Sequence, residues 1–189
     1  MKINLEQIFK ELEAWRNERK ITTQSQKDGY IVNAMEEFGE LSQALRGLEL
    51  ENVRQVAEYE VIDALCDIAV LSINACEVPV DSKVRVIDTD GIKLDEIDEL
   101  VYNCAGYSST GFNLYNYFNA ILWGCASICE QYGYDFEIAM LETIKERSSR
   151  TGSYDEKAKK WIKDTSDEAK AKWYKANYEL AKIEKGKQE

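Results

Sequence analysis

The chain has 189 residues and a formal net charge of −11, and it contains no histidine. This length allows one domain with its own core, or a subunit that completes its core by pairing, and the acidic balance argues against a nucleic-acid-binding surface. The lack of histidine excludes Ser/His and Cys/His nucleophile pairs and most zinc and non-haem iron sites, so any enzyme chemistry must use carboxylates, lysines and metal ions with oxygen ligands, such as Mg²⁺ or Mn²⁺.

The spacing of apolar residues predicts an all-α fold, an antiparallel bundle of about five main helices. The first predicted helix is amphipathic and ends near Glu18, and a polar connector follows it. The second runs from about residue 30 to residue 47, where Gly47 is a suitable C-cap. The third covers about residues 53–76 and stops before Pro79, because the residue preceding a proline disfavours helix.

Residues 78–110 interrupt this helical pattern as an insert. β-Branched residues on both sides of Asp90-Gly91 give a modest hairpin signal, and residues 94–106 predict a short helix. We expect the insert to act as a flap or an interface element.

Two further main helices follow the insert, over residues 112–133 and, with Asp135 as N-cap, up to about Arg150. A Gly-Ser turn and one charged helix are predicted after them. The predicted domain therefore covers residues 1–165, and residues 166–189 form a basic helical tail.

Charge is distributed unevenly along the chain. From Lys145 to the last residue, 13 basic residues outnumber nine acidic ones, so this part carries +4 and residues 1–144 carry −15. Such a division suits a site in which carboxylates hold metal and basic side chains hold phosphate. A solvated C-terminal helix would give the same distribution.

Two pairs of carboxylates stand in the second and third predicted helices. Glu37 and Glu40 share one helix face, and Glu60 and Asp63 share a face of the third helix, which is otherwise almost wholly apolar. The 19 residues between Glu40 and Glu60 suffice to end one helix and begin its antiparallel neighbour. Four carboxylates converging with no basic residue nearby would repel one another, and Mg²⁺ would relieve this. A solvated acidic face is the alternative, and Asp67 continues the same stripe.

The order of these motifs resembles that of a known family. Glu37-Phe-Gly-Glu40 followed by Glu60-Val-Ile-Asp63 is similar to the ExxE and ExxD motifs of the all-α nucleoside triphosphate pyrophosphohydrolases, which include MazG-type enzymes, dimeric dUTPases and phosphoribosyl-ATP pyrophosphohydrolase. The resemblance extends over residues 3–77 and 111–165, but it does not include the insert or the long tail.

This resemblance implies hydrolysis of an NTP or dNTP to the monophosphate and pyrophosphate, by attack of water at the α-phosphorus, in control of the nucleotide pool. Glu37, Glu40, Glu60 and Asp63 would be the catalytic residues and would hold Mg²⁺ (or Mn²⁺). Asp67 is a candidate further ligand.

Phosphate contacts are expected from the basic end of the last main helix and from the tail. Favourable charge at a helix C-terminus would also explain Lys145 and Arg147, and a solvated helix would explain the tail. The expected contacts are Lys145 and Arg150, then Arg147 and Lys175, with Lys172 and Tyr178 as residues that could close over the triphosphate.

The nucleoside site is less defined by the sequence. Asn74 lies two turns beyond Asp67 on the same stripe and could hydrogen-bond a sugar or a base edge. Trp15 could stack on a base, as could Trp123 or Tyr117. The alternatives are a polar residue at the rim of the bundle and aromatic residues in the core.

A homodimer or homotetramer is expected, because related enzymes form bundles in which two subunits complete the site, and because residues 113–132 are more apolar than one small domain needs. The expected partner is a nucleoside triphosphate, with no nucleic acid and no membrane. Two alternatives stay open: a narrower substrate such as dUTP or phosphoribosyl-ATP, and a non-catalytic helical bundle that binds a nucleotide or a protein partner.

Sequence features also bear on location. No apolar segment follows Lys2, so no signal peptide is expected, and there is no apolar run of about 18 residues that would span a membrane. The five cysteines form no Cys-x-x-Cys pair and lie mostly in apolar helical stretches, which predicts reduced, buried thiols. A cytoplasmic protein is therefore expected.

Overall fold

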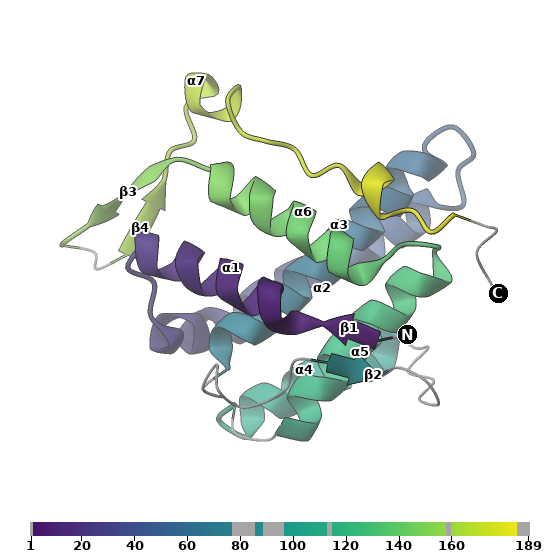
Figure 1. The fold of residues 1–189 in the computed structure, drawn as a ribbon, viewed down its shortest axis with the longest axis horizontal. Coiled ribbons are helices and arrows are strands. Elements are labelled where there is room, and N and C mark those ends of the chain that lie inside the picture. The colour runs from purple at the N-terminus through teal and green to yellow at the C-terminus, as the bar shows by residue number, and fades with distance from the viewer. Residues whose placement is uncertain (1, 77–85, 89–96, 113–114, 158–159, 185–189) are drawn as a thin grey trace.

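The computed structural model describes residues 2–76, 86–88, 97–112, 115–157 and 160–184, and over these residues the chain is mainly helical (Figure 1). The predicted all-α fold class is confirmed. The elements are, in chain order, β1 (Lys2–Asn4), α1 (Leu5–Glu18), α2 (Thr23–Gly47), α3 (Arg54–Ala75), β2 (Val86–Asp88), α4 (Ile97–Ser109), α5 (Tyr115–Gln131), α6 (Phe136–Ser149), β3 (Gly152–Asp155), β4 (Lys160–Lys163), α7 (Asp167–Lys170) and the 3₁₀ helix η1 (Tyr178–Ala181).

Polar side chains start three of the main helices. Asn4, Thr22 and Asp135 each accept a hydrogen bond from a backbone N–H in the first turn of α1, α2 and α6, as N-cap residues do. The predicted ends of the main helices are confirmed to within a few residues, except at the start of α2. This helix begins at Thr23 instead of near residue 30, because Thr22 caps it within the segment that was predicted to be a connector.

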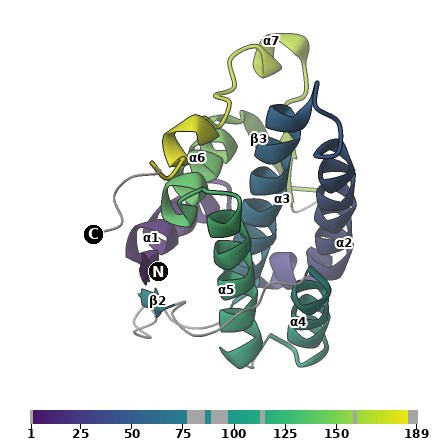
Figure 2. The ribbon, with the colours of Figure 1, turned by 90° about the vertical axis from the view of Figure 1, so that its right-hand side faces the viewer.

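Helix α3 lies at the centre of the bundle and contacts α1, α2, α5 and α6. Figure 2 shows it between α2 on one side and α5 and α6 on the other. Every residue from Ala64 to Ala75 is buried, which explains why apolar side chains surround this helix on almost all sides. Because α2 packs along α3, polar groups on the facing sides of the two helices are brought together.

The helical part of the insert belongs to the core. Helix α4 packs against α5 and α2. The buried ring of Tyr107 lies 5.8 Å from that of Tyr30 and 5.1 Å from that of Phe112, edge to face in both cases. The short helix predicted here is confirmed, and it packs on the bundle. The role of the insert as a flap or interface element stays a prediction.

A short sheet joins the N-terminus to the insert. Strands β1 and β2 pair antiparallel, with Ile3 opposite Ile87. Three residues of β1 are too few to give a sequence pattern, so this strand was not predicted. The Asp90-Gly91 turn of the predicted hairpin lies outside the described residues.

The chain after α6 differs from the single charged helix that was predicted. Strands β3 and β4 form an antiparallel hairpin, α7 has only four residues, and η1 is one short 3₁₀ turn. Gly152 allows the hairpin strands to approach closely, because a Cβ atom there would lie 2.3 Å from the carbonyl oxygen of Ile162. The basic helical tail was predicted over residues 166–189, and for the described residues 166–184 that prediction is wrong in its secondary structure.

Residues 173–183, which we call the C-terminal strap, follow this hairpin and run back along α6 (yellow in Figure 1). Two backbone hydrogen bonds fix the end of the strap beside the start of α6. Asp135 N–H donates to the Ala181 carbonyl at 2.7 Å, and Ile183 N–H donates to the Gly133 carbonyl at 2.8 Å. The strap is thus part of the folded body.

The cysteines match the prediction of reduced thiols. Cys66, Cys104, Cys125 and Cys129 are free and buried, and Cys76 is partly exposed. Burial raises the pKa of Cys125 and Cys129 well above the ordinary thiol value, so both stay protonated at neutral pH. Among the helices that the structure describes, none is long and apolar enough to cross a membrane.

Candidate functional site

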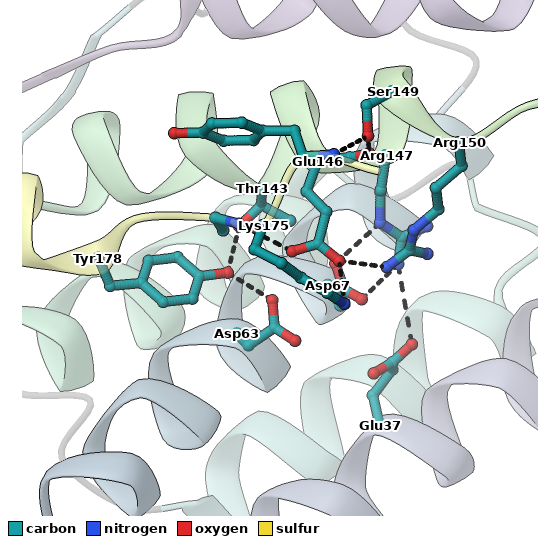
Figure 3. A network of polar contacts seen from close by, with 12 residues as sticks. Glu37, Asp63, Asp67, Thr143, Glu146, Arg147, Ser149, Arg150, Lys175 and Tyr178 are labelled. Atoms are coloured by element: carbon teal, nitrogen blue, oxygen red, sulfur yellow. Dashed lines mark hydrogen bonds and ion pairs between the residues drawn. The ribbon is translucent and has the colours of Figure 1, made fainter. Parts of the chain in front are cut away.

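An ion pair between α3 and α6 lies at the centre of the polar site (Figure 3). The Nε atom of Arg147 donates to Oδ1 of Asp67 at 2.9 Å, and its Nη2 atom lies 2.5 Å from Oδ2. The two side chains are only 16 % and 13 % exposed. Such a two-point contact is the strongest form of an Arg–carboxylate pair, and it explains how the apolar helix α3 accommodates a buried Asp67.

Glu37 approaches the same guanidinium from α2. Its Oε1 atom lies 3.9 Å from Nη2 of Arg147. The pKa of Glu37 is raised to about 8, mainly by burial and secondly by the nearby charge of Asp67, while the charge of Arg147 lowers it. One guanidinium therefore does not balance the negative charge of this site, which we call the carboxylate site: Glu37, Asp63, Asp67 and Arg147.

Asp63, one turn before Asp67 on α3, is contacted by the C-terminal strap. The hydroxyl of Tyr178 donates a short hydrogen bond to its Oδ1 atom (Figure 3). Burial and the charge of Asp67 raise the pKa of Asp63 to about 6, and the hydrogen bond from Tyr178 opposes this rise. A group 115 residues away in the sequence thus helps Asp63 to stay ionised.

The other two predicted ligands lie further out. Glu40 and Glu60 are exposed, and Glu60 borders a separate hollow of about 510 Å³ together with Gln43, Arg46 and Val56. Over the described ranges, no three acidic or thiol side chains lie together in an arrangement that could hold a metal ion.

The assumption that the carboxylates converge with no basic residue nearby is wrong. Arg147 lies among them, and it contacts both Asp67 and Glu37. The carboxylates of Glu37 and Asp67 therefore lie next to a guanidinium group.

Beside the carboxylate site, a cleft of about 630 Å³ opens between α1, α2, the end of α6 and the β3–β4 hairpin. Arg147 lines this cleft and so connects it to Asp67 and Glu37. The walls combine positive charge with indole rings, a combination suited to an anionic ligand that carries a flat ring. The charged and aromatic lining residues are Trp15, Arg19, Lys20, Arg147, Arg150, Trp161 and Lys163.

Arg19 holds this wall of the cleft together. Its side chain is only 3 % exposed, and the guanidinium lies 5.4 Å from the ring centre of Trp15 and 5.2 Å from that of Trp161. It also donates to the carbonyl groups of Ser148 and Arg150, at 3.0 and 3.1 Å. Arg19 thereby joins α1, the C-terminal end of α6 and the β-hairpin.

Sequence reasoning did not identify Arg19, Trp161 or Lys163 as site residues. The spacing of Trp15 and Arg19, one helical turn apart, was the local signal for a stacked pair. Trp161 and Lys163 enter the cleft only because their strand pairs with β3, and no local pattern predicts that placement.

The residues predicted to bind phosphate are divided by the structure. Arg147 and Arg150 line the cleft. Lys145 instead lies 3.5 Å from Glu142, with its ammonium group over the ring of Tyr174. Lys175 is exposed and lies 3.6 Å from Glu146. Lys145 thus lies on the side of α6 that faces the strap, and Lys175 belongs to the strap itself.

The residues predicted to bind the nucleoside are also separated. Trp15 lines the cleft, and its buried Nε1 atom has no hydrogen-bond partner among the described residues. Asn74 is buried, and its Oδ1 atom accepts a 2.6 Å hydrogen bond from Arg16. Trp123 and Tyr117 pack against the hydrophobic core. Of these four residues, Trp15 therefore both lines the cleft and has an indole N–H without a hydrogen-bond partner among the described residues.

Comparisons of the chain with protein-family models, with curated proteins and with solved structures found no match. The resemblance to the all-α pyrophosphohydrolases therefore depends on the carboxylate motifs and the stretches that flank them in the sequence.

Proposed function

We propose that the protein is a magnesium-dependent pyrophosphohydrolase that converts nucleoside triphosphates to monophosphates and pyrophosphate. One observation carries this proposal: largely buried carboxylates on α2 and α3 adjoin, through Arg147, a cleft lined by cations and indole rings. A nucleoside triphosphate needs both kinds of surroundings, because its phosphates must be neutralised and its base needs a flat apolar surface.

The acidic side chains fit a divalent cation. Carboxylate oxygens are the ligands that Mg²⁺ prefers, and the raised pKa values of Glu37 and Asp63 reflect burial and mutual repulsion that such an ion would relieve. Glu37 and Asp63 would hold it, and the exposed Glu40 and Glu60 would have to turn inward to join them. When bound, Mg²⁺ neutralises phosphate charge and makes a coordinated water more acidic.

The chain's own residues supply the rest of the binding site. Arg147, fixed in place by Asp67, and Arg150 would bind phosphate oxygens in the cleft. Trp15 or Trp161 would stack on the base, and Arg19 would keep both indoles in position. In this arrangement Asp67 orients Arg147 and is not itself a metal ligand.

The test is pyrophosphate release from a panel of NTPs and dNTPs, measured with Mg²⁺ and with EDTA. We expect Mg²⁺-dependent turnover in the wild type, its loss in Glu37→Gln and Asp63→Asn, and wild-type turnover in Glu36→Gln, because Glu36 is an exposed acid beside Glu37. Glu60→Ala shows whether Glu60 joins the site. Wild-type protein that releases no pyrophosphate from any nucleotide would contradict the proposal.

A second candidate is a nucleotide-binding protein without hydrolytic activity. The observation that favours it is the bidentate pair of Asp67 with Arg147, which satisfies the most buried carboxylate of the carboxylate site without a metal. This candidate predicts nucleotide binding that persists in EDTA and produces no pyrophosphate. Equilibrium dialysis with labelled dATP, in EDTA and in Mg²⁺, distinguishes the two.

We propose that the protein acts in nucleotide-pool control as a cytoplasmic homo-oligomer. The exposed side chains of Val32 and Met35 on α2, at 71 % and 69 %, are apolar surface that a second subunit could cover. Light scattering across a concentration series would measure the assembly.

A further inference from the structure

The C-terminal strap is held to α6 by an unusual set of contacts. Its backbone N–H groups donate to side chains of α6 that recur about once per turn, and two of the acceptors are carboxylates, which form stronger hydrogen bonds than neutral groups. The contacts are Tyr174 N to Ser149 Oγ at 2.8 Å, Ala176 N to Glu146 Oε2 at 2.9 Å and Asn177 N to Glu142 Oε2 at 2.9 Å.

Two tyrosine hydroxyls extend from the strap in different directions. Tyr174 donates to Glu142 of α6, outside the carboxylate site. Tyr178 is 5 % exposed and reaches past α6 to Asp63 of α3. Within the strap, Tyr178 therefore contacts the carboxylate site and Tyr174 does not, which makes Tyr174 a matched control.

The protons of this contact can be assigned by counting. The Tyr178 oxygen lies 2.8 Å from the hydroxyl of Thr143 and also hydrogen-bonds Asp63. An ionised carboxylate only accepts, so the single proton of Tyr178 goes to Asp63. Thr143 must then donate to Tyr178, and this replaces its alternative hydrogen bond to the carbonyl group of Ala139. The result is a chain of donors directed at Oδ1 of Asp63.

We propose that Tyr178 is a positioning residue that couples docking of the strap to cation binding at the carboxylate site. This inference rests on the proposed function, because it takes Asp63 to be a cation ligand. The hydroxyl fixes the orientation of the carboxylate, as hydrogen-bonding partners of metal ligands do elsewhere. Coupling between two equilibria is reciprocal, so a bound cation must in turn stabilise the docked strap.

The first experiment is calorimetric titration of the full-length protein with MgCl₂, without nucleotide. We expect Tyr178→Phe to bind Mg²⁺ about tenfold or more weakly than the wild type, while Tyr174→Phe binds as the wild type does. Thr143→Val removes only the first donor of the chain, so its loss of affinity should lie between those two.

The second experiment measures hydrogen exchange at the amides of residues 174–177, with Mg²⁺ and with EDTA. These amides should exchange more slowly with Mg²⁺ in the wild type and in Tyr174→Phe, and equally fast under both conditions in Tyr178→Phe. A purely structural role for Tyr178 would accelerate exchange under both conditions without this dependence on Mg²⁺. The wild-type measurement alone tests the coupling if Tyr178→Phe fails to fold.

Each result has a separate meaning. Mg²⁺ affinity in Tyr178→Phe equal to or higher than in the wild type, or wild-type strap amides indifferent to Mg²⁺, would overturn the coupling and leave the proposed cation site intact. No binding of Mg²⁺ by the wild type would overturn both. Weakened binding together with Mg²⁺-dependent protection supports the inference even if no nucleotide is hydrolysed.

Discussion

The aromatic cluster of Tyr30, Tyr107 and Phe112 is buried and the carboxylate site around Arg147 is largely buried, and α2 contributes to each, through Tyr30 and Glu37. The rings of the aromatic cluster meet edge to face at 5.1–5.8 Å, and nothing in it needs a charged partner. The carboxylate site holds more negative than positive charge. The aromatic cluster needs no added charge once it has folded. The carboxylate site, in contrast, keeps an excess of negative charge, and such perturbed groups are common in binding sites.

The largest expected effect comes from removing the one cation of the carboxylate site. Arg147→Met leaves Asp67 buried without a partner, and we expect it to lower the free energy of unfolding by about 3–5 kcal/mol. Urea denaturation at pH 7 measures this. Lys145→Met, on an exposed side chain of the same helix, should change it by less than about 0.5 kcal/mol. Equal effects of the two substitutions would show that the pair with Asp67 contributes no stability.

The pH dependence of the free energy of unfolding tests the carboxylate site through Glu37. Its carboxyl group faces those of Asp63, Asp67 and Glu40 and the guanidinium of Arg147. Its folded pKa of about 8 lies above its ordinary value of 4.5, so the folded state holds the proton more tightly. The proton on Glu37 therefore contributes to the free energy of unfolding. This contribution is complete below about pH 4.5 and is lost as the pH rises through about 8.

Glu37→Gln cannot ionise, so we expect it to be more stable than the wild type at pH 8 in EDTA, by about 2–4 kcal/mol. The two proteins should converge near pH 4.5. Thermal denaturation of both from pH 4.5 to 8.5 makes the comparison, with Glu36→Gln as control. A difference that does not vary with pH would contradict the raised pKa of Glu37.

Magnesium should stabilise the folded protein through the carboxylate site and not through the aromatic cluster. At a Mg²⁺ concentration of 100 Kd, we expect the wild type to gain about 2.7 kcal/mol in the free energy of unfolding. Asp63→Asn should gain much less, because it lacks a ligand charge. Denaturation with Mg²⁺ and with EDTA measures both, and a gain of the same size in Asp63→Asn would place the ion elsewhere.

The smallest effect is expected in the aromatic cluster. Tyr30→Phe removes the 2.8 Å hydrogen bond to Ser72, but Ser72 keeps its bond to the carbonyl group of Ile68. We expect a loss of about 1 kcal/mol, and the same loss with Mg²⁺ and with EDTA. A loss that depends on Mg²⁺ would show that the two buried regions are coupled.

The helices could be predicted because each depends on local patterns. Apolar spacing gives their number, and Asp135 gives the start of α6. The tail could not be predicted in this way. Its backbone donors bond to side chains of Glu142, Glu146 and Ser149 on another helix, so high helix propensity along the tail was outweighed by tertiary contacts.

The candidate site shows the same limit. The four carboxylates could be found from their spacing. The two-point ion pair of the site, however, joins Asp67 to Arg147, 80 residues later, and these were treated as secondary residues. Lys145 was preferred from sequence, although it lies on the other side of α6. Which face of α6 points to the cleft is decided by packing, and the sequence of that helix alone does not reveal it.

The contact of Tyr178 with Asp63 has a consequence for synthesis of the chain. A ribosome makes Asp63 115 residues before it makes Tyr178, and during that interval the helices that carry the acids can already pack. A nascent or prematurely terminated chain that ends before Tyr178 therefore lacks the hydroxyl that orients Asp63. Completion of the carboxylate site is in this way reserved for chains whose translation has passed the strap.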